Sequence, residues 1–226
     1  MNDILGDGTG SVQFDPNTKV NYGIEEPSGT LYLNNAIIEG NYTNFYQSSA
    51  IYCSNNLTIV NNGTSMVRNN YIDTTNLQNV YGIYASGYLT INGTGTITFI
   101  SGTGGTSYNC GIRSGLSGAP LYINGPKVES FGGIAESGGK SYGVCIGDIL
   151  NLYVARLIKG TLETRGYDSA AMCGPTDIAG YQYFVTNGSQ KIAIITVSES
   201  YEGSDAVSIV QDKTYANYKY ITVTNP

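Results

Sequence analysis

The segment YGIYASGYLTINGTGTITFISGTGG, residues 81–105, alternates apolar and polar side chains in two short runs and ends in a loop rich in glycine and threonine. Such alternation is typical of a half-buried β-strand, because successive side chains of a strand point to opposite faces. Glycine and asparagine interrupt the alternation where one strand has to turn into the next. The segment therefore predicts short strands that are joined by sharp corners.

The same pattern recurs along the chain. An x-Gly-Ile element stands at Tyr22-Gly23-Ile24, Ser49-Ala50-Ile51, Tyr81-Gly82-Ile83, Cys110-Gly111-Ile112, Tyr142-Gly143-Val144 and, in a degraded form, Ala170-Ala171-Met172. An alternating strand of the type Leu-x-Ile follows each element and begins at residues 31, 57, 89, 121, 152 and 183, which lie 26 to 32 residues apart. A third strand follows in several repeats, as in Ile97-Thr98-Phe99, Val128-Glu129-Ser130 and Leu162-Glu163-Thr164.

Repeats of this length and composition predict an all-β fold. Three short strands cannot bury their apolar face alone, so each repeat must stack on the next and share one continuous core. We expect a single-stranded, right-handed parallel β-helix, a β-solenoid, with three faces and about six coils. One domain spans residues 1–226 in this prediction, with an N-terminal cap at 1–20, coils at 21–186 and capping strands at 187–226.

Two apolar columns are expected to fill the solenoid, because equivalent positions of stacked strands form ladders. The first holds Ile24, Ile51, Ile83, Ile112, Val144 and Met172, and the second holds Leu31, Leu57, Leu89, Leu121 and Leu152. Asn-Gly pairs at residues 62–63, 92–93, 124–125 and 187–188 fall just after the Leu-x-Ile strands. A sharp corner at these pairs requires a positive φ, which glycine adopts without strain.

Composition excludes several classes of function. The chain has no histidine and no tryptophan, and only 12% of its residues are charged. Without histidine, the Ser-His-Asp and Cys-His constellations and the HExxH zinc site are excluded. A net charge of −6 argues against a nucleic acid partner. No apolar run is long enough to span or insert into a membrane.

The four cysteines, Cys53, Cys110, Cys145 and Cys173, show no spacing typical of a metal site. Cys145 and Cys173 occupy the same predicted column on adjacent coils, where the spacing between strands suits a disulfide. They either pair or remain a ladder of free thiols. Cys53 and Cys110 fall in other columns and are expected to be unpaired.

Several segments carry a resemblance to a known family. These are the opening GDGTGSVQFDPNTK, the elements YGIYASGYLTI and IYCSNNLTI, the strand pair LTINGTGTITF and the closing YKYITV. They resemble the secreted, repeat-built β-helix proteins of anaerobic and gut Firmicutes, which are often described as carbohydrate-binding domain proteins and are similar in fold to the pectate lyases. The resemblance implies carbohydrate binding at a bacterial cell surface or outside the cell. The start MNDILGDGTG lacks the regions of a signal peptide, so the export signal is expected to have been removed.

Aromatic side chains make up half of the two columns that point outward. The middle residue of the Leu-x-Ile strand gives Tyr32, Thr58, Thr90, Tyr122, Tyr153 and Phe184, and the residue after x-Gly-Ile gives Glu25, Tyr52, Tyr84, Arg113, Cys145 and Cys173. Tyrosine rings offer an apolar face and a polar edge, which suits sugar rings. The predicted carbohydrate-binding residues are Tyr122, Tyr153, Phe184, Tyr52 and Tyr84. Alternatively, the same rings only stabilise stacked strands.

A second hypothesis concerns the carboxylates of the third strand, since Glu129 and Glu163 should be neighbours on adjacent coils. Such a pair could hold a Ca²⁺ ion, and a nearby Lys127 or Arg165 could abstract the α proton of a uronate. This arrangement would make the protein a pectate-lyase-like polysaccharide lyase, and the same carboxylates are compatible with a glycosidase.

The sequence thus predicts a non-catalytic protein that binds polysaccharide, requires no cofactor unless calcium occupies the Glu129 and Glu163 site, and works as a monomer. Two alternatives stay open at this point. The first is a calcium-dependent polysaccharide lyase. The second is a structural or adhesive stalk that binds no small ligand.

Overall fold

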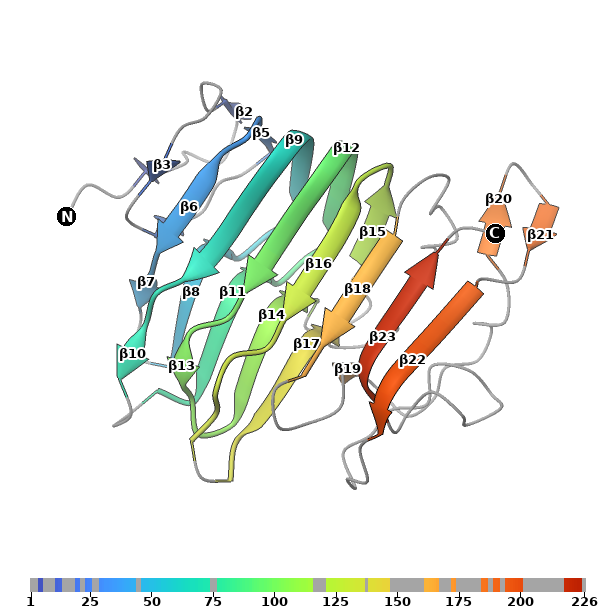
Figure 1. The fold of residues 1–226 in the computed structure, drawn as a ribbon. Coiled ribbons are helices and arrows are strands. Elements are labelled where there is room, and N and C mark those ends of the chain that lie inside the picture. The colour runs from blue at the N-terminus through green and yellow to red at the C-terminus, as the bar shows by residue number, and fades with distance from the viewer. Residues whose placement is uncertain are drawn as a thin grey trace.

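The computed structural model describes residues 4–5, 11–13, 19–20, 23–25, 29–43, 46–73, 77–115, 121–136, 138–146, 161–166, 172–173, 184–186, 189–191, 194–200 and 218–224. These residues form strands, bends and turns and contain no helix. Parallel strands stack into a β-solenoid of about three turns, with two large sheets lying one behind the other (Figure 1). The predicted all-β, parallel architecture is therefore confirmed.

One sheet, which we call sheet A, is built from the x-Gly-Ile elements. In spatial order its strands are β1 (Ile4–Leu5), β4 (Ile24–Glu25), β8 (Gln47–Cys53), β11 (Asn79–Ala85), β14 (Tyr108–Ser114), β17 (Lys140–Ile146) and β19 (Met172–Cys173). Each of these strands pairs in parallel with its neighbour. The short strand β7 (Tyr42–Thr43) pairs antiparallel with β8.

The other sheet, sheet B, carries the Leu-x-Ile strands and the strands that follow them. Its main path runs through β2 (Ser11–Gln13), β5 (Gly29–Leu33), β9 (Leu57–Asn69), β12 (Leu89–Ile100), β16 (Lys127–Phe131), β18 (Thr161–Arg165), β23 (Tyr218–Thr224) and β22 (Ile194–Ser200). The strands β3 (Lys19–Val20), β6 (Ile37–Gly40) and β15 (Leu121–Asn124) join this sheet beside the path. Two small sheets pair β10 (Ile72–Asp73) with β13 (Thr103–Gly104), and β20 (Phe184–Thr186) with β21 (Ser189–Lys191).

The predicted isoleucine column forms in the predicted register. Along sheet A the paired residues are Ile24, Ile51, Ile83, Ile112, Val144 and Met172, and Ile4 extends the column at its first strand. The side chains of Ile24, Ile51, Ile83, Ile112 and Val144 are fully buried. This column supplies much of the hydrophobic free energy of the fold, because a fully buried isoleucine contributes about 2 kcal/mol.

The predicted leucine column is wrong at its first member. Leu57, Leu89 and Leu121 pair as expected, but Leu31 pairs with Ile59, two residues beyond Leu57. Leu31 still points inward and is fully buried. A slip of two residues keeps every side chain on its own face of the sheet, so alternation alone does not fix the register.

Glycine in the x-Gly-Ile element faces the backbone of the opposite sheet. A Cβ atom on Gly82 would lie 2.5 Å from the carbonyl oxygen of Gly111 and 2.9 Å from that of Ile100 on β12. On Gly111 it would meet the backbone nitrogen of Phe131 on β16 at 2.7 Å. The two sheets therefore approach so closely at this edge that only glycine or a locally adjusted small residue fits.

The Asn-Gly corners have the predicted positive φ, at 142° for Gly63, 112° for Gly93 and 113° for Gly125. In β9 and β12, however, the strand continues through the corner, so the second and third predicted strands are one hydrogen-bonded element. The buried amide of Asn61 stabilises this bend, because its Nδ2 donates to the carbonyl oxygens of Gly63, Thr94 and Thr96 at 3.0 to 3.2 Å.

Beyond β18, sheet B changes direction. The strand β23 pairs antiparallel with β18 and with β22, so an antiparallel hairpin lies against the last parallel strand of the sheet. At the other end, β1, β2 and β3 pair in parallel with β4, β5 and β6 and continue the ladders. In the part of the chain that the structure describes, no helix is long and apolar enough to cross a membrane.

Candidate functional site

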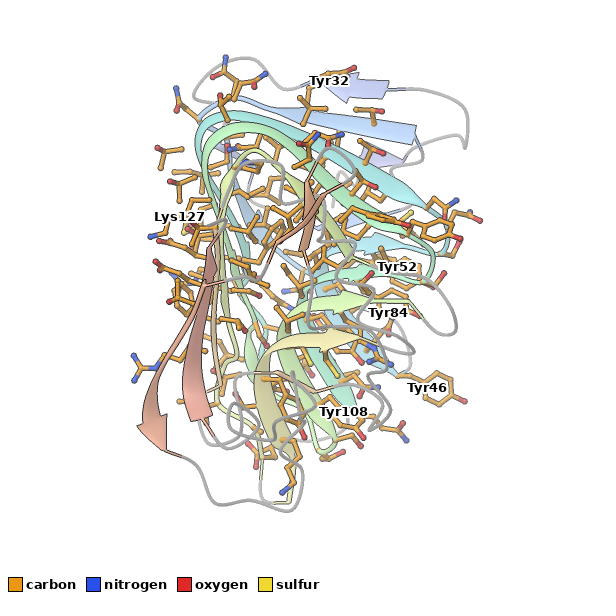
Figure 2. The ribbon with its side chains drawn as sticks, turned by 90° about the vertical axis from the view of Figure 1, so that its right-hand side faces the viewer. Tyr32, Tyr46, Tyr52, Tyr84, Tyr108 and Lys127 are labelled. Carbon is orange, nitrogen blue, oxygen red and sulfur yellow. The ribbon has the colours of Figure 1, made fainter. Side chains whose placement is uncertain are left out.

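Tyrosines gather on the outer surface of sheet A. Residues Glu25, Tyr52, Tyr84, Arg113, Cys145 and Cys173 pair along this surface in the predicted register. We define the tyrosine face as Tyr46, Tyr52, Asn79, Tyr84, Tyr108 and Arg113. Its labelled tyrosines lie on one side of the molecule and Lys127 lies on the opposite side (Figure 2). The solenoid thus separates an aromatic surface from a charged one.

The centre of the tyrosine face is a stack of rings. The ring centroids of Tyr52 and Tyr84 are 5.4 Å apart and the rings are almost parallel, at 9°. Tyr42 adds to the stack at 5.1 Å from Tyr52, and Tyr81 lies 5.6 Å from Tyr84. These rings pack against one another, so the predicted sugar-binding residues Tyr52 and Tyr84 offer no open ring face to a sugar.

Beneath the stack lies a second, smaller core outside the solenoid interior. It consists of the buried residues Tyr81, Tyr84, Cys110, Tyr142 and Cys145, with Tyr52 packed against it. Burial raises the pKa of the Cys110 thiol to about 12, although the nearby Arg113 opposes this shift. Burial also raises the pKa values of Tyr81 and Tyr84. All three groups are therefore neutral at physiological pH.

Two exposed tyrosines, Tyr46 and Tyr108, lie on either side of β11. Their side chains are 60% and 43% exposed. The backbone nitrogen of Asn79 donates to the carbonyl oxygen of Tyr46 at 3.2 Å, and Asn79 pairs with Tyr108 across the strands. The side-chain Oδ1 of Asn79 is buried and accepts no hydrogen bond from the described residues. Adjacent strands are about 4.8 Å apart, so the two tyrosine backbones flank Asn79 across about 10 Å.

The sequence analysis missed Tyr46, Asn79 and Tyr108 because it searched only the x-Gly-Ile and Leu-x-Ile motifs. All three residues lie upstream of an x-Gly-Ile element, at or next to the start of strands β8, β11 and β14. Alternation would not have placed all three on one face, because Asn79 and Tyr108 are register partners but Tyr46 precedes Gln47, the partner of Asn79 on β8.

The remaining aromatic candidates lie elsewhere. Tyr122, on β15, is half-buried and tilts against Tyr88 at 6.0 Å, and Tyr88 is 44% exposed. Phe184 belongs to β20, which pairs antiparallel with β21 in a separate sheet, so it does not continue the Tyr122 column as predicted. Tyr153 and the side chain of Phe184 lie outside the described residues. Tyr32 pairs with Val60 instead of Thr58, through the same two-residue slip as Leu31.

The structure confirms the prediction for Cys53 and Cys110 and favours one of the two alternatives for Cys145. Cys53 and Cys110 are free and buried. Cys145 is disulfide-bonded. Its partner in the strand ladder is Cys173, whose side chain lies outside the described residues. The Nη1 atom of Arg113 donates a hydrogen bond to the Sγ atom of Cys145 at 3.1 Å.

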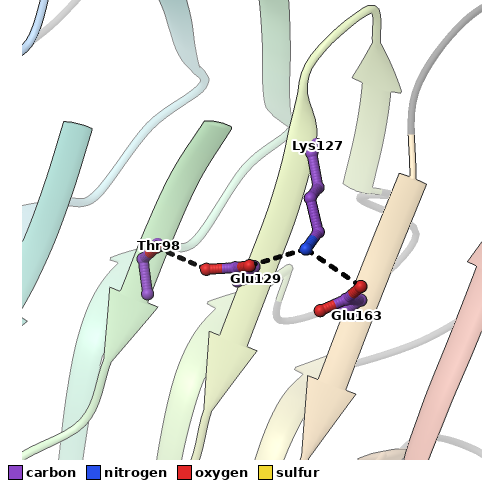
Figure 3. A network of polar contacts seen from close by, with 4 residues as sticks. All are labelled: Thr98, Lys127, Glu129 and Glu163. Carbon is purple, nitrogen blue, oxygen red and sulfur yellow. Dashed lines mark hydrogen bonds and ion pairs between the residues drawn. The ribbon is translucent and has the colours of Figure 1, made fainter. Parts of the chain in front are cut away.

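On the opposite surface, Glu129 and Glu163 are register neighbours, as the sequence predicts. Lys127 lies between the two carboxylates (Figure 3), with its Nζ 2.8 Å from Glu129 Oε1 and 3.0 Å from Glu163 Oε1. Thr98 donates its hydroxyl hydrogen to Glu129 Oε2 at 2.8 Å. Burial raises the pKa of Glu129, but the hydrogen bonds from Lys127 and Thr98 outweigh it and hold that pKa below its ordinary value.

This ion-pair network is poorly suited to the lyase chemistry considered above. Hydrogen bonds to Glu129 and Glu163 raise the pKa of Lys127 to about 12, so its ammonium group stays protonated at neutral pH and does not serve as a base. The ammonium also stands where a Ca²⁺ ion would have to bind both carboxylates. Among the described residues, no group of three or more His, Cys, Asp or Glu side chains could hold a metal ion.

Comparison with known proteins identifies no relative of this chain. No family model, no curated protein and no solved structure matches the chain.

Proposed function

We propose that this protein binds polysaccharide through the tyrosine face and does not cleave it. The proposal depends on one observation, the exposed rings of Tyr46 and Tyr108 on the same side of the molecule as Tyr52 and Tyr84 (Figure 2). Carbohydrate sites combine aromatic surface with a few polar groups that fix orientation. The exposed rings of Tyr46 and Tyr108 supply the aromatic surface, and their hydroxyl groups supply polar contacts to sugar hydroxyls.

The experiment is a glycan array of the purified chain, run with calcium and with EDTA, on three proteins. These are the wild type, a Tyr46→Ala/Tyr108→Ala variant and a Tyr88→Ala/Tyr122→Ala control. The control removes another tyrosine pair, in which Tyr88 is exposed and Tyr122 on β15 is half-buried. We expect binding in the presence of EDTA, loss of binding in the first variant and retention in the control.

Two outcomes would contradict this assignment. If the control loses binding and the Tyr46/Tyr108 variant keeps it, the Tyr122 column is the site and the tyrosine face is not. If no glycan binds under either condition, the proposal fails. Unchanged melting temperatures of both variants would show that neither result comes from unfolding.

A second candidate function is a structural or adhesive stalk. The stacked rings of Tyr42, Tyr52 and Tyr84 favour it, because they satisfy one another and stabilise neighbouring strands without a ligand. Absence of glycan binding in the array, together with a folded protein, would support this function.

We further propose that the solenoid is right-handed and three-faced with about six coils, and that residues 1–20 and 187–226 cap its ends. In this proposal the protein acts as a monomer outside the cell or at a bacterial surface. The disulfide at Cys145 supports an oxidising compartment of this kind. A crystal structure and sedimentation of the full chain would test these points.

A further inference from the structure

Arg113 stands out on the tyrosine face because no carboxylate of the described residues compensates its charge. The side chain is half-buried, and its neighbours in the ladder are Tyr84 and Cys145. Its hydrogen bond to Cys145 Sγ employs only Nη1, and no described carboxylate pairs with it. A guanidinium carries five donors, and partial removal of its charge from water is costly unless an anion compensates it.

On sheet B, Arg68 and Lys127 both form ion pairs with carboxylates of the chain. Arg68 pairs with Glu39 at 3.2 Å, and Lys127 pairs with both Glu129 and Glu163. Each of these cations finds its counter-charge within the chain. The groups that feel the charge of Arg113 are Tyr81, Tyr84 and Cys110, and all of them are neutral. An anion that neutralises Arg113 therefore has to come from outside the described residues.

We propose that Arg113 binds an acidic group, a carboxylate or a sulfate, on the polysaccharide that the tyrosine face holds. This inference rests on the proposed function and specifies its ligand class. The bond to Cys145 Sγ anchors Nη1 and leaves the Nε and Nη2 edge for the ligand. That edge matches two oxygens of a carboxylate or sulfate, and such a bidentate pair adds both affinity and orientation.

The ring stack and the arginine then act together. Tyr84 is the ladder neighbour of Arg113, and Tyr52 is the ladder neighbour of Tyr84. Tyr84 is close enough to Arg113 for the guanidinium charge to lower its pKa, against the larger effect of burial. Arginine and tyrosine are both enriched at binding surfaces. A neutral polysaccharide would leave the arginine without its counter-charge.

The test measures dissociation constants for chondroitin sulfate, unsulfated chondroitin and a neutral glucan by calorimetry. The proteins are the wild type, Arg113→Gln, Arg113→Lys and Arg68→Gln. The last variant is the matched control, since it removes the same charge from sheet B. We expect an acidic glycan to bind the wild type and to bind Arg113→Gln about tenfold to a hundredfold more weakly. Arg113→Lys should bind with intermediate affinity, and Arg68→Gln should bind like the wild type.

Comparison of the two chondroitins decides between the acidic groups. Equal affinity for both polymers assigns the carboxylate, and binding of the sulfated form alone assigns the sulfate. If only the neutral glucan binds, or if Arg113→Gln binds acidic glycan as well as Arg68→Gln does, the inference about Arg113 is wrong while polysaccharide binding stands. If none of the polymers and no glycan on the array binds, both proposals are wrong. Near-ultraviolet circular dichroism of each variant verifies that it is folded.

Discussion

Burial of the Cys110 thiol in the small core beneath the ring stack makes the free energy of unfolding depend on pH. Burial raises its pKa from 9.0 to about 12 in the folded protein. The unfolded chain therefore releases this proton at lower pH than the folded chain does. Stability from this group is fully present below pH 9 and is lost as the pH rises toward 12, because ionisation then favours the unfolded state.

We expect Cys110→Ala to remove this dependence. Between pH 8 and pH 10 the wild type should lose about 1.4 kcal/mol more of its unfolding free energy than the variant loses. Urea unfolding at the two pH values, without reductant, measures this difference. The tyrosines of the cluster are present in both proteins and therefore cancel. Equal losses in the two proteins would show that the thiol is accessible to solvent before unfolding.

At the residue scale, the sequence predicted what alternation controls. The inward isoleucines, the neighbouring pair Glu129 and Glu163 and the free thiols of Cys53 and Cys110 lie as predicted. Burial of Tyr84 was not predictable, because an outward position on a strand does not reveal what packs over it. The sequence analysis treated Lys127 as a base, so it did not predict that this residue forms ion pairs with Glu129 and Glu163.

At the scale of the strand, the close approach of the two sheets restricts the x-Gly-Ile element. We expect Gly82→Ala to destabilise the protein by about 2 kcal/mol, because the added methyl group would press against backbone atoms of β12 and β14 that side-chain rotation does not relieve. The equivalent residue on β8 is Ala50, which is fully buried. Ala50→Gly is therefore the control, and it should cost about 1 kcal/mol or less.

Thermal or urea unfolding followed by far-ultraviolet circular dichroism compares the two variants. A Gly82→Ala protein as stable as the wild type would mean that β11 and β12 separate at this edge in solution. The measurement thus tests the sheet spacing directly, independently of any ligand.

The strand register was predictable only where two different motifs constrained it. In β8, β11, β14 and β17 the glycine or alanine and the following apolar residue fix the alignment together. In β5 only alternation was available, and Leu31 aligns with Ile59 after a slip of two residues. The predicted place of Phe184 in the parallel ladder was wrong for a related reason. An alternating strand pattern does not distinguish a parallel ladder from the antiparallel pair β20 and β21.

Across the whole molecule, the disulfide of Cys145 is the one covalent constraint in the described structure. We expect two of the four cysteines to react with an alkylating agent in the denatured, unreduced chain, and all four to react after reduction. Peptide mapping should identify Cys173 as the partner of Cys145. Reduction should lower the unfolding free energy by about 3 kcal/mol.

Mass spectrometry and unfolding with and without reductant provide these measurements, and Cys145→Ser should behave like the reduced wild type. Four reactive thiols in the unreduced chain would contradict the structure at this position. Unchanged stability after reduction would mean that the strand ladder alone holds β17 and β19 together.

The stack of tyrosine rings also affects the fluorescence of the protein. The chain has 20 tyrosines and no tryptophan, so tyrosine is its only strong near-ultraviolet chromophore. The rings of Tyr42, Tyr52, Tyr84 and Tyr81 follow one another at 5.1 to 5.6 Å. At such separations the excitation energy of one ring is transferred to the next ring faster than either ring emits. Excitation energy therefore migrates along the ring stack and depolarises its fluorescence. A rise in fluorescence anisotropy would show that the stack has been disrupted.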